Sequence, residues 1–311
     1  MKKRWIIIFS SILVFILVFA IKENTHYEND LEKVNSSQAQ IIPWGQKLVG
    51  TDSLKKKQIK VAVIDSGINS SHEDLKGKVI KKYNVLEPKK EVIDDFGHGT
   101  AVAGIITAND NNIGFLGVNQ NIELLDIKVL NSHGQGKLED LINGVKWAIE
   151  NNVDIINISF GVQSDSRELQ NVILEAYKAN IIIIAAVGNT YGLNIDYPAN
   201  YSEVLSVSAI NKDLETLSSS AKGKIDFTAP GDQILSTNKN GNYELFSGSS
   251  FAAAYVTGII AFWINEYENN FNNKVKEKGL NDFFNYLEQN AAENTKFNNI
   301  KEHGILLKIK K

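Results

Sequence analysis

The sequence contains no cysteine among its 311 residues. This absence excludes disulfide bonds, cysteine-ligated zinc, a thiol nucleophile and a lipid-modified amino-terminal cysteine. We therefore expect packing to stabilise the fold, with oxygen-ligated metal as the metal chemistry that remains open.

A large excess of charge of either sign is also missing. There are 33 basic and 36 acidic residues, for a formal net charge of −3, and the lysines are scattered rather than gathered in one stripe. Nucleic acid is excluded as an expected partner, since it would need a concentrated positive field. With 43% hydrophobic residues the chain can bury a full core, and we expect one large domain that acts as a monomer.

A long apolar run lies near the amino terminus. The cations of residues 2–4 precede residues 5–21, which are apolar apart from two serines. This order is typical of an export signal, and both a cleaved signal peptide and an uncleaved anchor in the membrane fit its length. The positive flank stays inside the cell. We expect the body of the protein to be extracellular, either secreted or anchored to the outer face of the cytoplasmic membrane.

The chain is expected to have three parts. Residues 1–21 form the signal peptide or membrane anchor, and residues 22–38 are polar and aperiodic, which indicates a tether or short pro-segment. Residues 39–311 form the folded domain.

Within this domain, short β-branched runs alternate with amphipathic stretches. The runs KVAVID, IELLDIKVL, VDIINISF and IIIIAAVG read as strands buried on both faces, and residues 138–148 and 165–179 have helical spacing. Alternation of strand and helix predicts an α/β fold with three layers, in which a mostly parallel sheet lies between helices. Functional side chains then gather at the carboxyl ends of the strands.

Three segments of the sequence contain residues suited to nucleophilic catalysis. Asp65 ends the run KVAVID, and His98 lies between two glycines in FGHGTAVAGII. The segment FSGSSFAAA offers Ser247, Ser249 and Ser250 before a helical pattern. A serine needs a base within hydrogen-bond reach and a third group that orients the base. The other histidines, at positions 26, 72, 133 and 303, are expected on the surface or in loops.

The blocks VAVIDSGI, GHGTAVAG and GSSFAAA together resemble the signature blocks of the subtilisin-like serine protease family. The resemblance runs from about Ala39 to the carboxyl terminus. It implies that Ser250 is the nucleophile, His98 the general base and then acid, and Asp65 the group that holds the tautomer of the ring. Asn189, after IIIIAAVG, resembles the oxyanion asparagine of the family.

The resemblance also implies a cleft in which substrate binds as an added strand. One edge of this cleft is Ser159, Phe160 and Gly161, and the other contains Gly134 and Gly136. Leu138 and Leu141 are expected to face a more distant substrate residue in an apolar pocket. The chain departs from the family pattern at Phe251, Ala254 and Tyr255, where methionine, proline and histidine are usual, and Phe251 should crowd the leaving-group side.

A structural calcium site is implied through the loop NDNNIGFLG. The expected ligands are the side chains of Gln40, Asp74 and Asn111 and the backbone oxygens of Asn109, Ile113 and Phe115. Such a set of oxygen ligands suits a hard cation.

Asp196, in NIDYPAN, aligns with the floor of the pocket that receives the side chain on the acyl side of the cut. A carboxylate in a partly dry pocket favours a cationic partner, so we expect cleavage after lysine or arginine. A solvated aspartate that caps the turn before Pro198 is the alternative.

The expected activity is that of an exported serine endopeptidase acting on a peptide or a precursor protein. Too few residues precede Ala39 for a folding pro-domain. In this respect the chain resembles the peptidases that remove leader peptides from lantibiotic precursors. A broad-specificity degradative subtilase and an inactive peptide-binding scaffold remain as alternatives. The similarity of AQIIPWG to a mature subtilisin amino terminus suggests cleavage of the Gln38–Ala39 bond.

Overall fold

The computed structural model describes residues 27–36, 39–53, 56–271, 274–291 and 305–306. The apolar run at 5–21 lies outside these residues. Within them, no helix combines the length and the apolar composition needed to cross a membrane.

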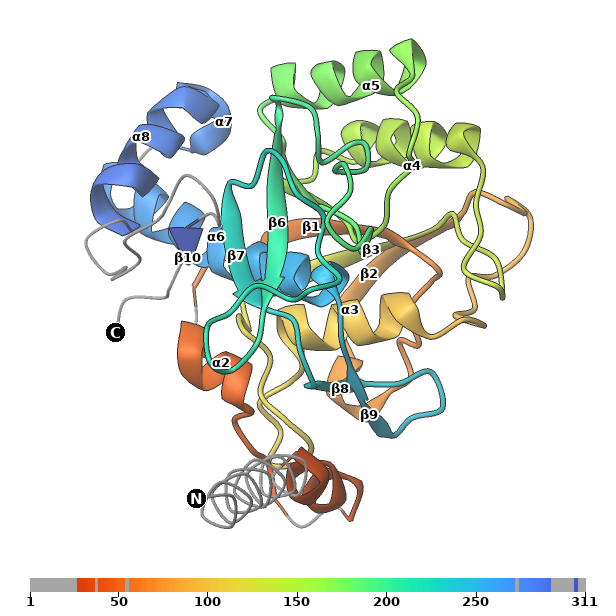
Figure 1. The fold of residues 1–311 in the computed structure, drawn as a ribbon, viewed down its shortest axis with the longest axis vertical. Coiled ribbons are helices and arrows are strands. Elements are labelled where there is room, and N and C mark those ends of the chain that lie inside the picture. The colour runs from red at the N-terminus through yellow and green to blue at the C-terminus, as the bar shows by residue number, and fades with distance from the viewer. Residues whose placement is uncertain (1–26, 37–38, 54–55, 272–273, 292–304, 307–311) are drawn as a thin grey trace, which may run out of the picture.

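An eight-stranded sheet forms the middle layer, and every neighbouring pair of its strands is parallel (Figure 1). The strand order is β10-β7-β6-β5-β4-β1-β3-β2. The four predicted strands are confirmed as β1, β3, β4 and β5. The bounds are β1 Ile59–Asp65, β2 Val79–Asn84, β3 Ile122–Lys128, β4 Ile155–Ile158, β5 Ile182–Ala186, β6 Val204–Ile210, β7 Phe227–Pro230 and β10 Ile305–Leu306.

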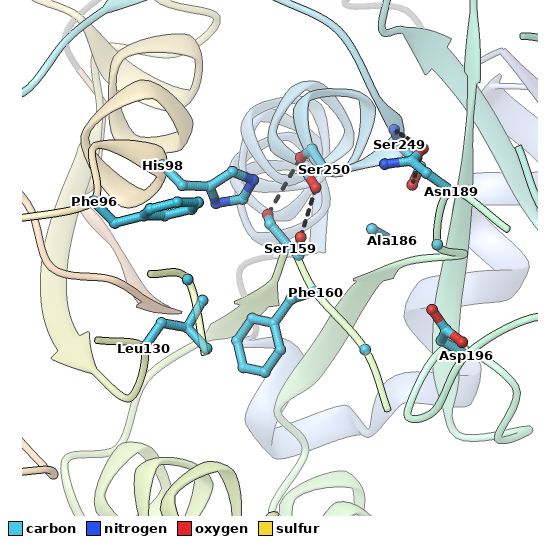
Figure 2. Close-up of a pocket in the computed structure, with 13 residues that line it drawn as sticks. Phe96, His98, Leu130, Ser159, Phe160, Ala186, Asn189, Asp196, Ser249 and Ser250 are labelled. Carbon is cyan, nitrogen blue, oxygen red and sulfur yellow. Dashed lines mark hydrogen bonds between the residues drawn. The ribbon is translucent and has the colours of Figure 1, made fainter. Parts of the chain in front are cut away.

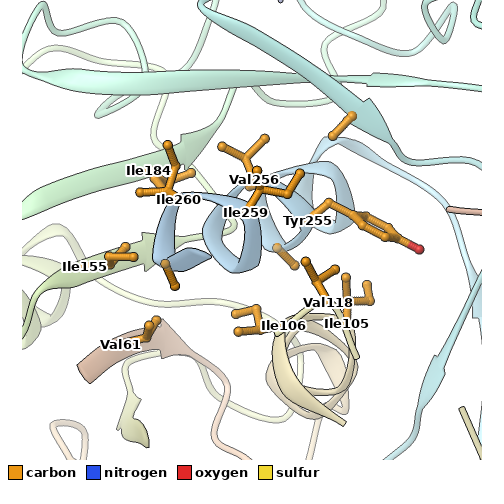
Figure 3. Packing of buried hydrophobic residues seen from close by; sticks show 14 of the residues in the cluster. Val61, Ile105, Ile106, Val118, Ile155, Ile184, Tyr255, Val256, Ile259 and Ile260 are labelled. Atoms are coloured by element: carbon orange, nitrogen blue, oxygen red, sulfur yellow. The ribbon is translucent and has the colours of Figure 1, made fainter. Parts of the chain in front are cut away.

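Helices cover both faces of the sheet, which confirms the expected three layers. Val61 and Val63 of β1 pack into the core shared with α3 and α6, while Ala62 and Ile64 pack into the core under α4 and α5. Alternation of side chains along a strand thus serves two cores. Figure 3 shows the first of these cores around α6. The helix bounds are α3 His98–Thr107, α4 Leu138–Glu150, α5 Arg167–Lys178 and α6 Ser249–Phe271.

The helices differ in pattern because they differ in burial. On α4 and α5 the buried residues recur at helical spacing, with Leu141 and Val145 as examples, and the opposite face is polar. In contrast, α6 is buried on all sides along most of its length. It runs through the middle of one core and carries its first residues to the edge of the sheet.

Shorter elements complete the domain. The hairpin of β8 and β9 is antiparallel and precedes α6. The bounds are α2 Trp44–Val49, η1 Glu73–Leu75, β8 Ile234–Thr237, β9 Tyr243–Phe246, α7 Val275–Lys278 and α8 Leu280–Ala291.

Residues 27–35 form a helix that packs on this hairpin. Val34 is 1% exposed and packs in a small cluster with Phe115 and Leu235. The Asn35 side chain donates to the Tyr243 carbonyl at 3.3 Å and accepts from the Tyr243 amide at 3.0 Å. The described part of the segment expected to be a tether is therefore docked on the domain, because its few apolar side chains share one helix face.

Candidate active site

Asp65 and His98 meet where β1 ends and α3 begins. Nδ1 of His98 lies 2.9 Å from each carboxylate oxygen of Asp65, which is completely buried. The backbone amide of Ser66 donates to the Asp65 carboxylate at 2.7 Å. These contacts hold the imidazole with its other nitrogen, Nε2, free to face a substrate or a nucleophile.

The environment of His98 favours its protonated form. Burial by itself lowers the pKa of this imidazole, but the negative charge of Asp65 and the hydrogen bond to it outweigh burial, and Asp94 adds to their effect, so the pKa is raised. The His98 side chain remains 19% exposed, which leaves it accessible from the pocket.

Ser250 stands in the first turn of α6 and faces His98 (Figure 2). Its hydroxyl donates to the carbonyl of Ser159 at 2.6 Å. Gly248, two residues earlier, has φ 142°, a backbone conformation that other residues rarely adopt. The Phe251 ring lies 5.4 Å from the His98 ring and therefore covers one side of the site.

Asn189 follows β5 and is held by the residue next to Ser250. Its Oδ1 accepts from the amide and the hydroxyl of Ser249, at 3.2 and 3.3 Å. With the oxygen engaged, the Nδ2 donor is directed to the pocket beside Ser250 (Figure 2). An amide donor in this place can stabilise negative charge that develops on an attacked carbonyl oxygen.

A pocket of about 230 Å³ joins these groups. Its lining consists of Phe96, His98, Leu130, Gly134, Ser159, Phe160, Gly161, Ala186, Gly188, Asn189, Asp196, Ser249 and Ser250. The pocket therefore extends along the carboxyl ends of several strands, as a parallel sheet predicts.

Asp196 lies at the far end of this pocket from His98 (Figure 2). A Cβ atom on Gly161 would lie 2.4 Å from Cβ of Asp196, and one on Gly188 would lie 2.4 Å from its Oδ2, so both glycines make room for this side chain. Burial raises the pKa of the Asp196 carboxyl. No ion pair joins Asp196 to a cation among the residues that the structure describes.

The predicted cleft residues do not all lie on the pocket. Ser159, Phe160, Gly161 and Gly134 line it, whereas Gly136, Leu138 and Leu141 are not among its lining residues. Leu141 is 1% exposed and belongs to the core under α4, and Leu138 packs against the same core. A helical apolar stripe serves the core in the same pattern that a pocket wall would show, so sequence spacing does not separate the two.

Sequence reasoning missed Phe96, Leu130 and Ala186. Phe96 stands two residues before His98, and its ring would be 2.7 Å from a Cβ on Gly134, so the two close one end of the pocket. Leu130 comes from the end of the predicted strand IELLDIKVL. The observed strand β3 ends at Lys128, so Leu130 lies just past its carboxyl end. This position could have marked Leu130 as a candidate for the pocket.

His72 was expected on the surface or in a loop, and it lies in the loop before η1 but not on the surface. This residue is 2% exposed, and its Nδ1 accepts from the Asp74 amide at 3.2 Å while Nε2 lies 3.0 Å from the Asn242 carbonyl. It caps η1 and fills space beside the hairpin, a role that depends on contacts distant in sequence. His133 is exposed as expected, and the histidines at 26 and 303 lie outside the described residues.

The predicted calcium ligands form one cluster beside η1. The Gln40 amide donates to the Asn109 carbonyl at 2.6 Å, and the Asn111 amide donates to Oδ1 of Asp74 at 3.0 Å. The Tyr243 hydroxyl donates to Oδ2 of Asp74 at 3.0 Å. Asp74 is completely buried, and this burial raises the pKa of its carboxyl.

The set has a single carboxylate, and the described residues include no group of three or more acidic or histidine side chains that could hold a metal. The oxygens of the Gln40 and Asn111 side chains would face Asn109 and Asp74 only after both amides rotate, with a cation between the oxygens, and Oδ1 of Asn111 would then leave the Ile113 amide, from which it accepts at 3.2 Å. The ligand set would contain one carboxylate and several neutral oxygens, and such a set fits a calcium ion.

Comparison with known proteins gives consistent results. The sequence model of the subtilase family matches residues 56–303. The major intracellular serine protease of Bacillus subtilis is 38% identical over 253 residues, which cover 76% of this chain and 79% of that protein. Subtilisin DY of Bacillus licheniformis is 36% identical over 74% of this chain and 86% of its own length. The thermostable alkaline protease of Halalkalibacterium halodurans is 36% identical over 80% of this chain and 70% of its own length.

The family match, the parallel sheet between helices and the serine, histidine and aspartate around one pocket agree. The chain belongs to the subtilase family and is a subtilisin-like serine endopeptidase.

Proposed function

We propose that this endopeptidase uses Ser250, His98, Asp65 and Asn189 to cut an exported precursor after lysine or arginine. The observation that carries the specificity is the partly buried Asp196 carboxylate at the far end of the pocket that contains Ser250. The proposed catalytic roles rest on the contact between His98 and Asp65 and on the place of His98, Ser250 and Asn189 around one pocket.

The reaction begins when the Ser250 hydroxyl turns from the Ser159 carbonyl to Nε2 of His98, which accepts its proton. The serine oxygen attacks the substrate carbonyl, and the resulting oxyanion accepts a hydrogen bond from Nδ2 of Asn189. His98, now positive, is stabilised by Asp65 and gives its proton to the departing amine. Water then releases the acyl group by the same route in reverse, and Ser250 regains its proton.

Asp196 selects the substrate through charge. A carboxylate that has lost part of its hydration and lacks a cationic partner gains most from a substrate ammonium or guanidinium group. Truncation of one partner of a desolvated charge pair costs about 2–5 kcal/mol, so the preference for arginine over leucine should reach tens-fold or more. A broad-specificity degradative protease, the alternative, would not need this carboxylate.

The proposal of export rests on the amino-terminal sequence rather than on the relatives. The relatives include one protease named as intracellular and one named as minor extracellular, so family membership leaves the compartment open. The basic residues 2–4 before the apolar run 5–21 favour export of residues 39–311, by secretion or with anchoring. Removal of a leader peptide from a lantibiotic precursor is the narrow task that we propose, because a pocket with a carboxylate at its far end suits a cut after a basic residue.

The proposal includes a structural calcium ion held by the side chains of Asp74, Gln40 and Asn111. Three carbonyl oxygens, of Asn109, Ile113 and Phe115, would complete the site. The ion would stabilise the loop that it binds, and it takes no part in the chemical steps.

The decisive experiment varies only the substrate residue before the cut. Peptides with arginine, lysine, leucine, phenylalanine or alanine at that position are compared by kcat/KM with the wild type, Asp196→Asn and, as an inactive control, Ser250→Ala. We expect a preference for arginine and lysine that Asp196→Asn reduces at least tenfold. A wild-type preference for leucine, or an arginine preference that Asp196→Asn leaves intact, would support the degradative alternative.

A further inference from the structure

Asp94 is a buried carboxylate that lies four residues before His98. It is 6% exposed and accepts four hydrogen bonds. Oδ1 accepts from the Ser66 hydroxyl at 2.8 Å and from the Gly97 amide at 2.7 Å, and Oδ2 accepts from the amide and hydroxyl of Thr100 at 2.9 and 2.5 Å. A loop carboxylate so fully engaged is held in one position.

These partners belong to the two elements that carry Asp65 and His98. Ser66 directly follows Asp65 at the end of β1, while Gly97 and Thr100 flank His98 at the start of α3. The Ser66 hydroxyl also accepts from the Gly99 amide at 3.0 Å. Asp94 therefore connects the end of the strand to the beginning of the helix, and it is not among the residues that line the pocket.

The two elements touch closely at this point. A Cβ atom on Gly99 would lie 2.2 Å from the Gly67 carbonyl oxygen and 3.1 Å from Cβ of Asp65. The N-cap residue Gly97 has no side chain to satisfy the first amides of α3, and Asp94 binds two of these free amides instead. Loss of Asp94 would leave them without a partner and would loosen the placement of His98.

The charge of Asp94 acts in the same direction as that of Asp65. Both raise the pKa of His98 against the opposing effect of burial. The other charged groups near Asp94 come from its own loop, from β3 and from the turn between β8 and β9. Asp126 is buried near it, Lys128 donates to the Ser66 carbonyl and to Asp95, both at 2.7 Å, and Lys239 donates to the Asp95 carbonyl at 2.6 Å.

We propose that Asp94 is a positioning residue for the protease reaction, which holds His98 against Asp65 and adds to the stabilisation of the imidazolium. This inference rests on the proposed role of His98 as the general base. Asp94 touches neither the substrate nor the reacting atoms, so its effect reaches the reaction through the orientation and the charge state of His98.

The test compares Asp94→Asn with Ser66→Ala and with Asp95→Asn in the exported protein. Asp95→Asn removes the same charge from the adjacent residue, which is 47% exposed and pairs with Lys128. The readouts are kcat and KM on an arginine ester, the pH profile of kcat/KM and the rate of labelling of Ser250 by a fluorophosphonate.

We expect Asp94→Asn to lower kcat at least tenfold with little change in KM, and to move the acid limb of the profile to lower pH. Ser66→Ala keeps the carboxylate, so it should lower kcat less and leave the limb in place. Asp95→Asn should leave both near the wild type. If Asp94→Asn matches the wild type in kcat and in the acid limb, or matches Asp95→Asn, the proposal is overturned.

A substitute variant and the behaviour of the wild type separate the role of Asp94 from the proposed catalytic roles. If Asp94→Asn does not fold, Thr100→Val takes its place, because it removes one donor to the same carboxylate. A loss of kcat without a change in KM would support the positioning role of Asp94, and an unchanged kcat would overturn it. A wild-type protein that neither cleaves nor labels would refute the proposed catalytic roles. An active wild type with an unaffected Asp94→Asn would refute only the role of Asp94.

Discussion

Nδ1 of His98 lies 2.9 Å from both carboxylate oxygens of the buried Asp65, and this contact turns the opposite edge of the ring to Ser250 (Figure 2). The contact joins the last residue of β1 to the first residue of α3, and η1 and β2 lie between these two elements in the chain.

The raised pKa of His98 predicts the acid limit of activity. His98 must be neutral to accept a proton, so kcat/KM should fall on the acid side with an apparent pKa above the ordinary value of about 6.5. Asp65→Asn should shift this limb to lower pH in whatever activity remains. The pH profile on an arginine ester measures both, and a limb at or below the ordinary value would contradict the expectation.

The raised pKa of His98 also predicts how the stability of the protein changes with pH. A histidine whose pKa is raised by folding stabilises the native state below its unfolded pKa, and this contribution is lost as pH rises through the folded value. Asp65→Asn should therefore destabilise the protein more at pH 5.5 than at pH 8.5. Urea unfolding at the two pH values measures the difference.

Asn189→Ala should lower kcat with little effect on KM. In subtilisin the loss of the oxyanion asparagine costs about 10²–10³ in kcat, and that magnitude sets the expectation here. Thermal unfolding provides the structural control, since Oδ1 of Asn189 also holds Ser249. A parallel rise in KM would instead indicate that Asn189 binds the ground state.

If the proposed calcium ion is bound, the protein should respond to chelators in a way that depends on Asp74. Chelation should lower the Tm of the exported protein by several degrees, because a ligand that binds only the native state stabilises it. In Asp74→Asn this response should largely vanish. Without calcium, Asp74→Asn should be neutral or stabilising at alkaline pH, since burial raises the pKa of the Asp74 carboxyl and makes its charge costly. An identical melting curve with and without chelator would refute the proposed calcium site.

Val34→Asp tests whether the helix at 27–35 belongs to the folded domain. Val34 is 1% exposed among apolar side chains, so the substitution should lower the free energy of unfolding by about 2–4 kcal/mol. Lys33→Ala, at a neighbouring exposed side chain, is the matched control. Both are made in a Ser250→Ala background to prevent self-cleavage at Gln38–Ala39. Equal Tm values for the two variants would mean that the helix does not contribute to stability.

The buried Asp126 carboxylate should lower the stability of the protein at alkaline pH. Burial raises the pKa of this carboxyl to about 8, and its Oδ1 has no hydrogen-bond partner among the residues that the structure describes. Its folded pKa lies above the unfolded value, so stability is lost as pH rises from about 4 through 8. Asp126→Asn should therefore stabilise the protein above pH 8, by about 1–3 kcal/mol, and change little at pH 5. Urea unfolding at pH 5 and pH 9 measures the change, and a loss of stability at pH 9 would contradict it.

The strands that could be predicted are those buried on both faces. KVAVID and IIIIAAVG are dense in β-branched residues because helices cover both of their sides. The edge strand β2 has the sequence VIKKYN and exposes its lysines, and β6 contains serines at buried positions, so neither has this signature. Their place in the sheet depends on pairing with β3 and β5, which local pattern does not contain.

Local sequence patterns identified the candidate catalytic residues, because a reactive residue needs a particular side chain in a particular local setting. Asp65 at a strand end, His98 between glycines and Ser250 at a helix start are each local patterns, and their three blocks indicated the protease family. Tertiary structure alone decided which apolar residues line the pocket and which lie in the core, as for Leu130 and Leu141. It also brought Asp94 to Ser66 and Val34 to the β8–β9 hairpin, because such contacts depend on how distant elements pack and not on the residues beside them in the chain.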